Sequence, residues 1–171
     1  TAPTKEELEK DWALEDLDPT QRIFARRCIS WAEKTRAIYK RIERTGVPED
    51  PPQLRHWLGG SAGTGKSSTF KTAVQHMRYI FEDIPAKIEL TAYTGVAAFN
   101  MRFGARTTSS CFAIFPNTKW KPELTGPAAT RLEKQWNNVV LLIVDEISFI
   151  GRALFARMHF RTQQGRREWL G

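Results

Sequence analysis

The stretch that decides the fold is GSAGTGKS at residues 60–67, which matches the pattern G-x-x-x-x-G-K-S. Glycines let backbone N–H groups curl around phosphates, and a following helix presents its positive end to the same anion. Lys66 is then expected to reach the β- and γ-phosphates, and the Ser67 hydroxyl to bind Mg²⁺. The pattern predicts a nucleotide site made of Gly60, Ser61, Ala62, Gly63, Thr64, Gly65, Lys66, Ser67 and Ser68.

The segments around this loop alternate between strand and helix patterns. Residues 54–59 predict a short strand, although Arg55 and His56 suit a buried parallel strand poorly, and residues 66–81 predict a helix. Further along, residues 87–92 alternate as a strand and residues 95–101 are small and apolar enough for a tight helix. This alternation indicates an α/β domain, with a mostly parallel sheet and helices on both faces.

A second informative stretch is VVLLIVDE at residues 139–146. Six consecutive aliphatic residues predict a strand covered on both faces, and Asp145 falls at the carboxyl edge of the sheet, where ligands bind. We expect Asp145 to hold Mg²⁺ through its water shell, and Glu146 to orient and deprotonate an attacking water. The simpler interpretation is a core strand capped by two solvated acids, but the phosphate loop in the same chain favours hydrolysis.

Helix signals mark both ends of the chain. Asp18 is a candidate N-cap with Pro19 at the first helical position, and the pattern continues until just before Gly46. Residues 1–16 predict a peripheral helix or arm. Near the other end, an apolar face is formed by Ile150, Leu154 and Met158.

Composition narrows the possible partners. The 171 residues carry 26 basic and 19 acidic side chains, a net charge of +7 that favours polyanions. Two cysteines make neither a disulfide framework nor a zinc motif, so we expect a reduced, intracellular chain with both cysteines buried. No apolar run approaches the roughly 20 residues that cross a bilayer, so no membrane partner is expected.

Three further stretches resemble motifs of superfamily-one helicases. LDPTQ at residues 17–21 resembles the Q motif, in which the amide of Gln21 would pair with the adenine edge. LTAYTGVAAFN at residues 90–100 resembles motif Ia, and GARTTSS at residues 104–110 falls where motif Ib is expected. Together with the two stretches above, their order resembles the PIF-type (petite integration frequency) DNA helicases, relatives of RecD, from about residue 17 to residue 160.

The resemblance implies a RecA-like lobe that uses ATP and Mg²⁺, with Lys66, Asp145 and Glu146 as its catalytic residues. It implies a monomeric motor that moves 5′ to 3′ on single-stranded DNA and unwinds duplex DNA in repair, recombination or telomere maintenance. A nuclear location is expected, with mitochondria equally open. Small hydroxyl residues and exposed backbone N–H groups suit phosphate contacts. The DNA-backbone candidates are Thr94, Gly95, Thr107 and Ser110.

Departures from the family pattern shape the remaining expectations. Ser109 stands where the family usually has a histidine, and Ser61 where it commonly has proline. We expect residues 1–45 to form a helical segment and residues 54–171 an incomplete RecA-like lobe, without the γ-phosphate sensor or the second lobe. Half a motor would bind ATP weakly and would not unwind a duplex. The alternatives are a non-catalytic ATP- and DNA-binding remnant, or a P-loop phosphotransferase.

Two weaker patterns each leave two interpretations. Trp120 lies between Lys119 and Lys121, and it is either a base-stacking residue or an incidental loop tryptophan. The last helix carries five arginines that either follow DNA or form its solvated face. They are Arg152, Arg157, Arg161, Arg166 and Arg167.

Overall fold

The computed structural model describes residues 2–59 and 65–166 and divides the chain into two compact units, with the boundary between Lys87 and Ile88. We call them the first unit and the second unit. Several predicted residues lie outside the described ranges. They are Gly60, Ser61, Ala62, Gly63 and Thr64 of the phosphate loop, and Arg167 of the basic tail.

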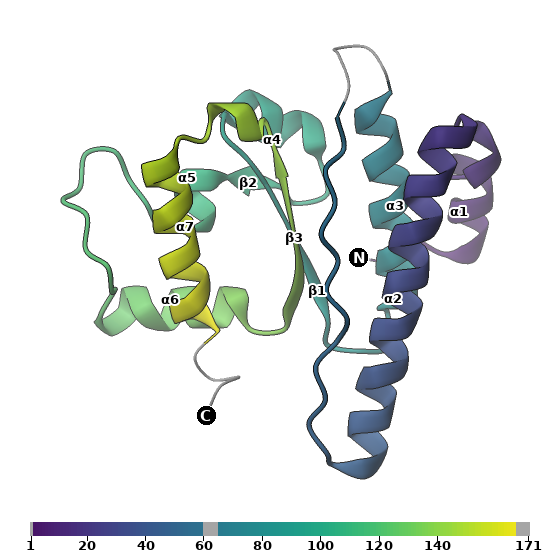
Figure 1. The fold of residues 1–171 in the computed structure, drawn as a ribbon, viewed down its shortest axis with the longest axis horizontal. Helices are drawn as coiled ribbons and strands as arrows, with labels where there is room; N and C mark the ends of the chain where they lie inside the picture. Colours follow the sequence, from purple (N-terminus) through teal and green to yellow (C-terminus); the bar gives the residue numbers. More distant parts are fainter. Residues whose placement is uncertain (1, 60–64, 167–171) are drawn as a thin grey trace. The chain divides into compact units, whose positions relative to one another are not determined.

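The first unit is helical (Figure 1). Its elements are α1 (Lys5–Asp11), η1 (Leu14–Asp16), α2 (Pro19–Thr45) and α3 (Lys66–Ile80). The start of α2 is as predicted, because the Asp18 carboxylate accepts hydrogen bonds from the backbone N–H groups of Thr20 and Gln21. It ends at Gly46, whose φ of +68° is a left-handed conformation that glycine adopts without a Cβ penalty.

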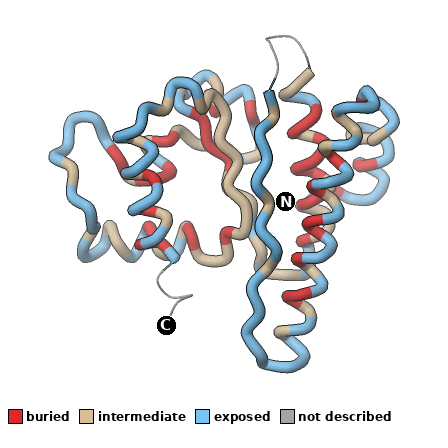
Figure 2. The backbone as a smooth tube through the Cα atoms, viewed as in Figure 1, coloured by how far each residue is buried: buried red, intermediate tan, exposed pale blue. Residues whose placement is uncertain are grey.

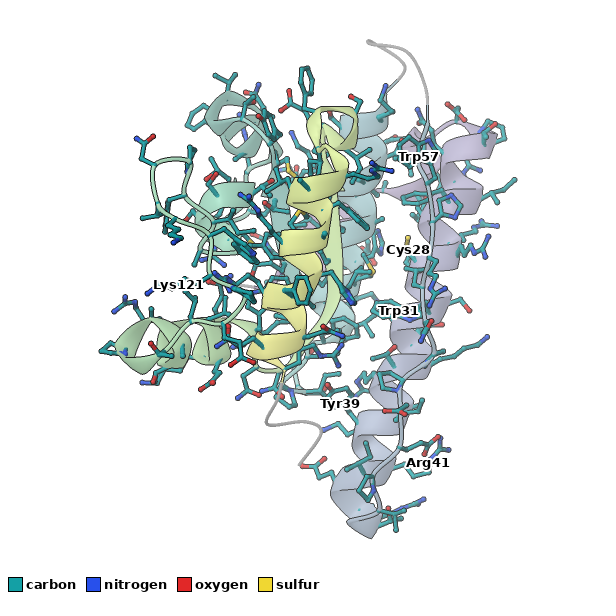
Figure 3. All side chains as sticks on the ribbon, turned by 60° about the vertical axis from the view of Figure 1, so that its left-hand side comes forward. Cys28, Trp31, Tyr39, Arg41, Trp57 and Lys121 are labelled. Carbon is teal, nitrogen blue, oxygen red and sulfur yellow. The ribbon has the colours of Figure 1, made fainter. Side chains whose placement is uncertain are left out.

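Apolar packing between α2 and α3 forms the core of the first unit. Figure 2 shows buried residues on the facing sides of both helices. Cys28, Trp31 and Tyr39, labelled in Figure 3, are buried side chains of α2. The Trp31 ring meets Phe81, which caps α3, edge-on at 5.9 Å. This pairing fixes the helix that begins at Lys66 against the helix that carries Gln21.

Residues 54–59 correct one prediction, because they form no strand. Residues 47–59 have no regular secondary structure, and Trp57 is 71% exposed. A strand of a parallel sheet needs apolar side chains on both faces, and Arg55 and His56 cannot supply them. The segment follows α2 instead, where the His56 ring packs on Phe24 at 4.8 Å.

The second unit contains a three-stranded sheet of order β2-β1-β3 (Figure 1). The strands are β1 (Lys87–Ala92), β2 (Arg106–Thr107) and β3 (Val139–Asp145), and β1 runs parallel to β2 with Thr91 opposite Arg106. The helices are α4 (Gly95–Met101), α5 (Thr108–Cys111), α6 (Gly126–Trp136), η2 (Ile147–Phe149) and α7 (Arg152–Gly165). This arrangement confirms the α/β class.

Strand β3 is less covered than its aliphatic sequence predicts. Only Val139 is buried, and the other six residues are half-buried. The reason is position, since β3 lies at an edge of the sheet formed by the described strands. Its carboxyl end therefore carries Asp145 at a partly open border of the unit.

The core of the second unit lies where α6, α7 and β3 come together. Its buried residues are Cys111, Phe112, Ile114, Leu132, Trp136, Val139 and Met158. The Trp136 ring packs on Phe112 with centroids 5.0 Å apart. A Cβ on Gly165 would lie 2.7 Å from the Trp136 Cβ, so the helix can approach the tryptophan only with glycine there. Ile150 packs on this core but precedes α7, so the predicted apolar face of that helix begins at Leu154. None of the helices in the described ranges is long and apolar enough to span a membrane.

Candidate functional site

The start of α3 supplies the described part of the predicted phosphate site. Lys66 is its first residue, Ser67 and Ser68 follow and are exposed, and Gly65 is its N-cap. The φ of Gly65 is +76°, a left-handed conformation that favours glycine. The first turn of α3 thus begins directly after the glycine-rich loop, as anion binding at a helix N-terminus requires.

Gln21 lies against this same turn. A Cβ on Gly65 would be 2.5 Å from the Gln21 Nε2, while the Gln21 Oε1 accepts a hydrogen bond from the Asp18 backbone N–H at 3.3 Å. The start of α2 therefore holds the amide that reaches the end of the phosphate loop. The structure brings these two predicted nucleotide contacts together within the first unit, and adenine recognition by Gln21 stays a prediction.

In the second unit, Asp145 is the last residue of β3 and Glu146 follows it. The Asp145 Oδ1 accepts a hydrogen bond from the Glu146 backbone N–H at 2.8 Å. Glu146 has a φ of +56°, which is uncommon for a residue with a side chain and costs about 1–3 kcal/mol. Such backbone conformations persist only where the surroundings hold them, and they gather at functional sites.

Thr94 is the partner of Glu146. The Glu146 Oε2 accepts two hydrogen bonds, from the Thr94 hydroxyl at 2.8 Å and from the Thr94 backbone N–H at 3.2 Å. The same hydroxyl oxygen accepts from the Ala97 N–H and caps α4. Sequence reasoning assigned Thr94 to DNA and Glu146 to catalysis and missed their contact. The sequence shows that both residues come shortly after the carboxyl ends of predicted strands, but it does not show that these strands are neighbours.

The other DNA-backbone candidates lie on nearby short elements of the second unit. Thr107 ends β2, and its hydroxyl accepts a hydrogen bond from the Ser110 N–H at 3.3 Å, which caps α5. Thr107 is paired opposite Ala92, the last residue of β1, whereas Gly95 is exposed at the start of α4. The structure therefore brings Thr107 and Ser110 together at one edge of the sheet.

An aromatic pair flanks the contact between Thr94 and Glu146, and the sequence analysis did not single it out. Tyr93 and Phe149 stack with ring centroids 5.8 Å apart and planes 11° apart, and they are 43% and 62% exposed. Tyr93 directly precedes Thr94, and Phe149 follows Glu146 by three residues. Their stacking adds an apolar contact beside the polar one.

The chemistry of Ser67 and Asp145 fits Mg²⁺. A hydroxyl and a carboxylate are hard oxygen donors, and Mg²⁺ is typically held by one or two carboxylates together with substrate phosphates and waters. A dedicated cage is not needed, and the described ranges contain no group of three or more histidine, cysteine or acidic residues placed to hold a metal ion. The two candidate ligands lie in different units.

Arg161 corrects the solvated-face interpretation of the basic tail, whereas Arg152 and Arg166 are exposed as that interpretation predicts. Arg161 is 2% exposed and donates hydrogen bonds to the carbonyls of Lys121 and Pro122. Its guanidinium lies 4.3 Å from the centroid of the Trp120 ring, and that of Arg157 lies 5.2 Å away. Arg161 is thus not part of a solvated face. Together the two arginines fasten the loop before α6 through its tryptophan.

The cysteines behave as predicted for small buried residues. Both are free and buried. Burial raises the pKa of the Cys28 thiol to about 11, and burial together with nearby Glu89 raises the pKa of Cys111 further. Neutral thiols are poor nucleophiles, so neither belongs to a reactive centre.

The amino-acid sequence of the chain is similar to that of a known protein family. The model of the PIF1-like helicase family matches residues 31–168. The chain is similar to proteins named ATP-dependent DNA helicase PIF1: 31% identical over 101 residues in Emericella nidulans, covering 58% of this chain and 13% of the relative. The corresponding protein of Candida albicans is 34% identical over 103 residues, covering 58% and 11%.

A third relative, ATP-dependent DNA helicase PIF1 of Saccharomyces cerevisiae, is 27% identical over 168 residues, which cover 96% of this chain and 18% of the relative. The chain therefore spans less than a fifth of the length of these curated relatives. No solved structure matches the chain.

Proposed function

Because this chain belongs to the PIF1-like helicase family, we propose that it is the part of a DNA helicase that binds and hydrolyses ATP in response to DNA. The finer parts of the proposal come from the motif resemblance. They are movement from 5′ to 3′ on single-stranded DNA, unwinding of duplex DNA in repair, recombination or telomere maintenance, a monomeric motor, and a nuclear or mitochondrial location.

One observation carries the proposal, namely the pair of hydrogen bonds from Thr94 to Glu146. Thr94 belongs to the stretch that resembles the DNA-contacting motif Ia, and Glu146 follows the strand that ends in the candidate Mg²⁺ ligand. A single side-chain contact therefore joins the residue expected to meet DNA to the residue expected to activate water. A small-molecule phosphotransferase has no need of that link.

The chemistry follows from these donors and acceptors. While the Thr94 hydroxyl and N–H both donate to Oε2 of Glu146, they fix the orientation of the carboxylate at Thr94. A DNA phosphate at Thr94 would take these donors, since phosphate oxygens are strong acceptors. The released carboxylate then orients and deprotonates the attacking water.

The remaining residues position the nucleotide. Lys66 reaches the phosphates from the first turn of α3, and Gln21 approaches the same turn from α2. Ser67 and Asp145 would hold Mg²⁺, which neutralises charge on the transferred phosphoryl group.

The test is ATP turnover with and without single-stranded DNA in a complete protein that contains this chain, as wild type and as Thr94→Val. We expect DNA to stimulate the wild type, and the ratio of the two rates to fall toward one in Thr94→Val, because valine keeps the shape and loses the hydroxyl. Thr94→Ser should keep the ratio. Thr4→Val is the matched control, since it removes a hydroxyl that caps α1, a helix of the same length as α4, and Thr4 is not among the DNA-backbone candidates.

Other outcomes would replace the proposal. Transfer of phosphate to a small acceptor, without any effect of DNA, would establish a phosphotransferase. ATP binding without turnover at any DNA concentration would establish a non-catalytic remnant. A DNA stimulation that is unchanged in Thr94→Val would leave the helicase but remove the proposed link through Glu146.

A further inference from the structure

The second unit contains a pocket of about 440 Å³ that the proposed ATP site does not use. Its walls come from α5 and the loop that follows it, from α6 and from α7. Its volume lies in the range of small-molecule sites, about 300–1,000 Å³. Ser110, one of the DNA-backbone candidates, lies in its wall.

The pocket combines an apolar floor with a cationic rim. Ile114 and Leu132 are buried in the floor, and Phe115 lines the pocket with 53% of its surface exposed. The cations in its lining are Lys119, Lys121, Arg131, Arg157 and Arg161. Among the described residues that line the pocket, none is acidic. This lining is complementary to a ligand with negative charge and a flat apolar part.

Arg161 is a charged side chain that its neighbours hold in a fixed position in the wall of the pocket. It is 2% exposed, and the carbonyls of Lys121 and Pro122 and the Trp120 ring hold its guanidinium. Its Nε is nevertheless buried with no hydrogen-bond partner within the described part of the chain. Because that atom is buried from solvent, it does not meet a ligand, and Arg161 instead supplies fixed positive charge in the wall of the pocket.

The two aromatic residues of the pocket differ in what they offer. Guanidinium groups of Arg157 and Arg161 already lie over the Trp120 ring, so it is a poor platform for a base. The Phe115 ring is exposed beside the apolar floor. An exposed ring beside several cations is the usual arrangement for a stacked base with its phosphate.

We propose that this pocket binds one nucleotide of single-stranded DNA, with the base against Phe115 and the phosphate at the cationic rim. The inference rests on the proposed function, because it takes the DNA strand of the helicase as its ligand. Ser110 connects the pocket to the DNA-backbone candidates, so one strand can occupy both. An acidic peptide would satisfy the cations but would leave the exposed ring and the apolar floor without a flat partner.

The test is the affinity of the 171-residue chain for fluorescent oligothymidylate, measured by anisotropy without ATP over a series of salt concentrations. We expect Arg131→Glu to weaken binding by roughly tenfold or more at low salt, and to lower the slope of log K against log salt by about one. Lys134→Glu is the matched control, because it makes the same charge change on the exposed surface of the same helix outside the pocket.

Phe115→Ala tests whether a DNA base stacks on the Phe115 ring. It should weaken binding by roughly tenfold, as the loss of one stacked ring predicts, and the effect should disappear on a strand of abasic nucleotides. The effect of Arg131→Glu should persist on that strand. Phe160→Ala is the control, since Phe160 is 49% exposed and lies outside the pocket. Thermal melts of all four variants verify folding.

Each contrary result is informative. Pocket variants that bind DNA as their controls do, beside a wild type that binds normally, overturn the pocket and leave the helicase. A wild type that binds no DNA overturns both. Thymidine monophosphate that binds as tightly as the strand would make this a free-nucleotide site, and a glutamate-rich peptide that displaces the strand at equal concentration would make it a protein-docking site. Both outcomes contradict the proposal.

Discussion

The residues predicted to bind ATP fall into two halves, one in each unit, and each unit holds its own half by a different kind of contact. In the first unit, Gly65 lies so close to Gln21 that a single added carbon would collide with the amide. In the second unit, two hydrogen bonds join Glu146 to Thr94. The first half depends on close packing and the second on donors and acceptors. Substitutions that change volume should therefore damage the first half, and substitutions that change charge should damage the second.

The largest expected effect comes from the polar half. In a complete protein that contains this chain, Glu146→Gln should lower ATP turnover by a factor on the order of 10² or more, because the amide cannot take a proton from water. ATP and Mg²⁺ should stay bound, and the amide oxygen can still accept from Thr94. Steady-state hydrolysis and equilibrium ATP binding separate these effects. Asp145→Asn, one residue earlier, should instead weaken the dependence on Mg²⁺. Normal hydrolysis by Glu146→Gln would assign water activation to another residue.

Lys66→Ala tests the half that lies in the first unit. Loss of the charged hydrogen bonds to the phosphates should weaken ATP binding roughly 10- to 100-fold. The melting temperature without ATP should change little, because a cation in the first turn opposes the helix dipole and alanine favours the helix. Titration with ATP and a thermal melt test both parts. Lys71→Ala, on the same helix beyond the first turn, should leave ATP affinity unchanged. Equal losses in the two variants would contradict the assignment.

Substituting one tightly packed glycine in each unit compares how much close packing contributes to the stability of the two units. Gly165→Ala should destabilise by about 1–3 kcal/mol, because the new Cβ meets the Cβ of buried Trp136, which cannot move away. Gly65→Ala should cost about 1–2 kcal/mol for the left-handed backbone, while the Gln21 amide can swing aside. Urea unfolding measures both. Adding Gln21→Ala should restore none of the backbone cost, and a full rescue would show that the collision dominates.

Much of the fold could be predicted because local chemistry determines it. The boundaries of α2 follow from the cap at Asp18 and from Gly46, and β1 covers residues 87–92 as its alternating pattern predicts. The proximity of Thr94 and Glu146 required only the order of two strands, which no local pattern contains.

The failures share one cause, which is that tertiary partners override local patterns. Residues 54–59 have the length of a strand but lack the side chains to be covered on both faces. Arg161 resembles a surface residue in a helical repeat of cations, but Trp120 and two loop carbonyls bury it. Burial of an arginine depends on acceptors some 40 residues away in sequence, which periodicity cannot reveal.

Ion pairs in the two units should contribute less to stability than the contacts discussed above. In the second unit, the half-buried Glu89 accepts from Arg106 at 2.7 Å and from the Cys111 thiol at 3.5 Å. Glu89→Gln should cost about 1–2 kcal/mol, because hydrogen bonds to a charged group are replaced by weaker neutral ones. Urea unfolding at neutral pH gives the value. A variant as stable as the wild type would show that Gln135, which also accepts from Arg106, holds the arginine alone.

The exposed pair of the first unit should give the smallest effect. Two hydrogen bonds from the Arg36 guanidinium, with Lys40 nearby, lower the pKa of Asp83 to about 2. Because the folded pKa lies below the ordinary value of about 3.9, any stability from the pair is present above pH 4 and is lost as the pH falls toward 2. Both partners are substantially exposed, so water and salt screen the attraction and Asp83→Asn should barely change the melting temperature at pH 7. An NMR titration of the Asp83 carboxyl tests the pKa directly, and molar salt should move it back toward the ordinary value. Titration near 3.9 at low salt would mean that the pair does not persist in solution, whereas a large loss of stability in Asp83→Asn would mean that the first unit, too, relies on charge.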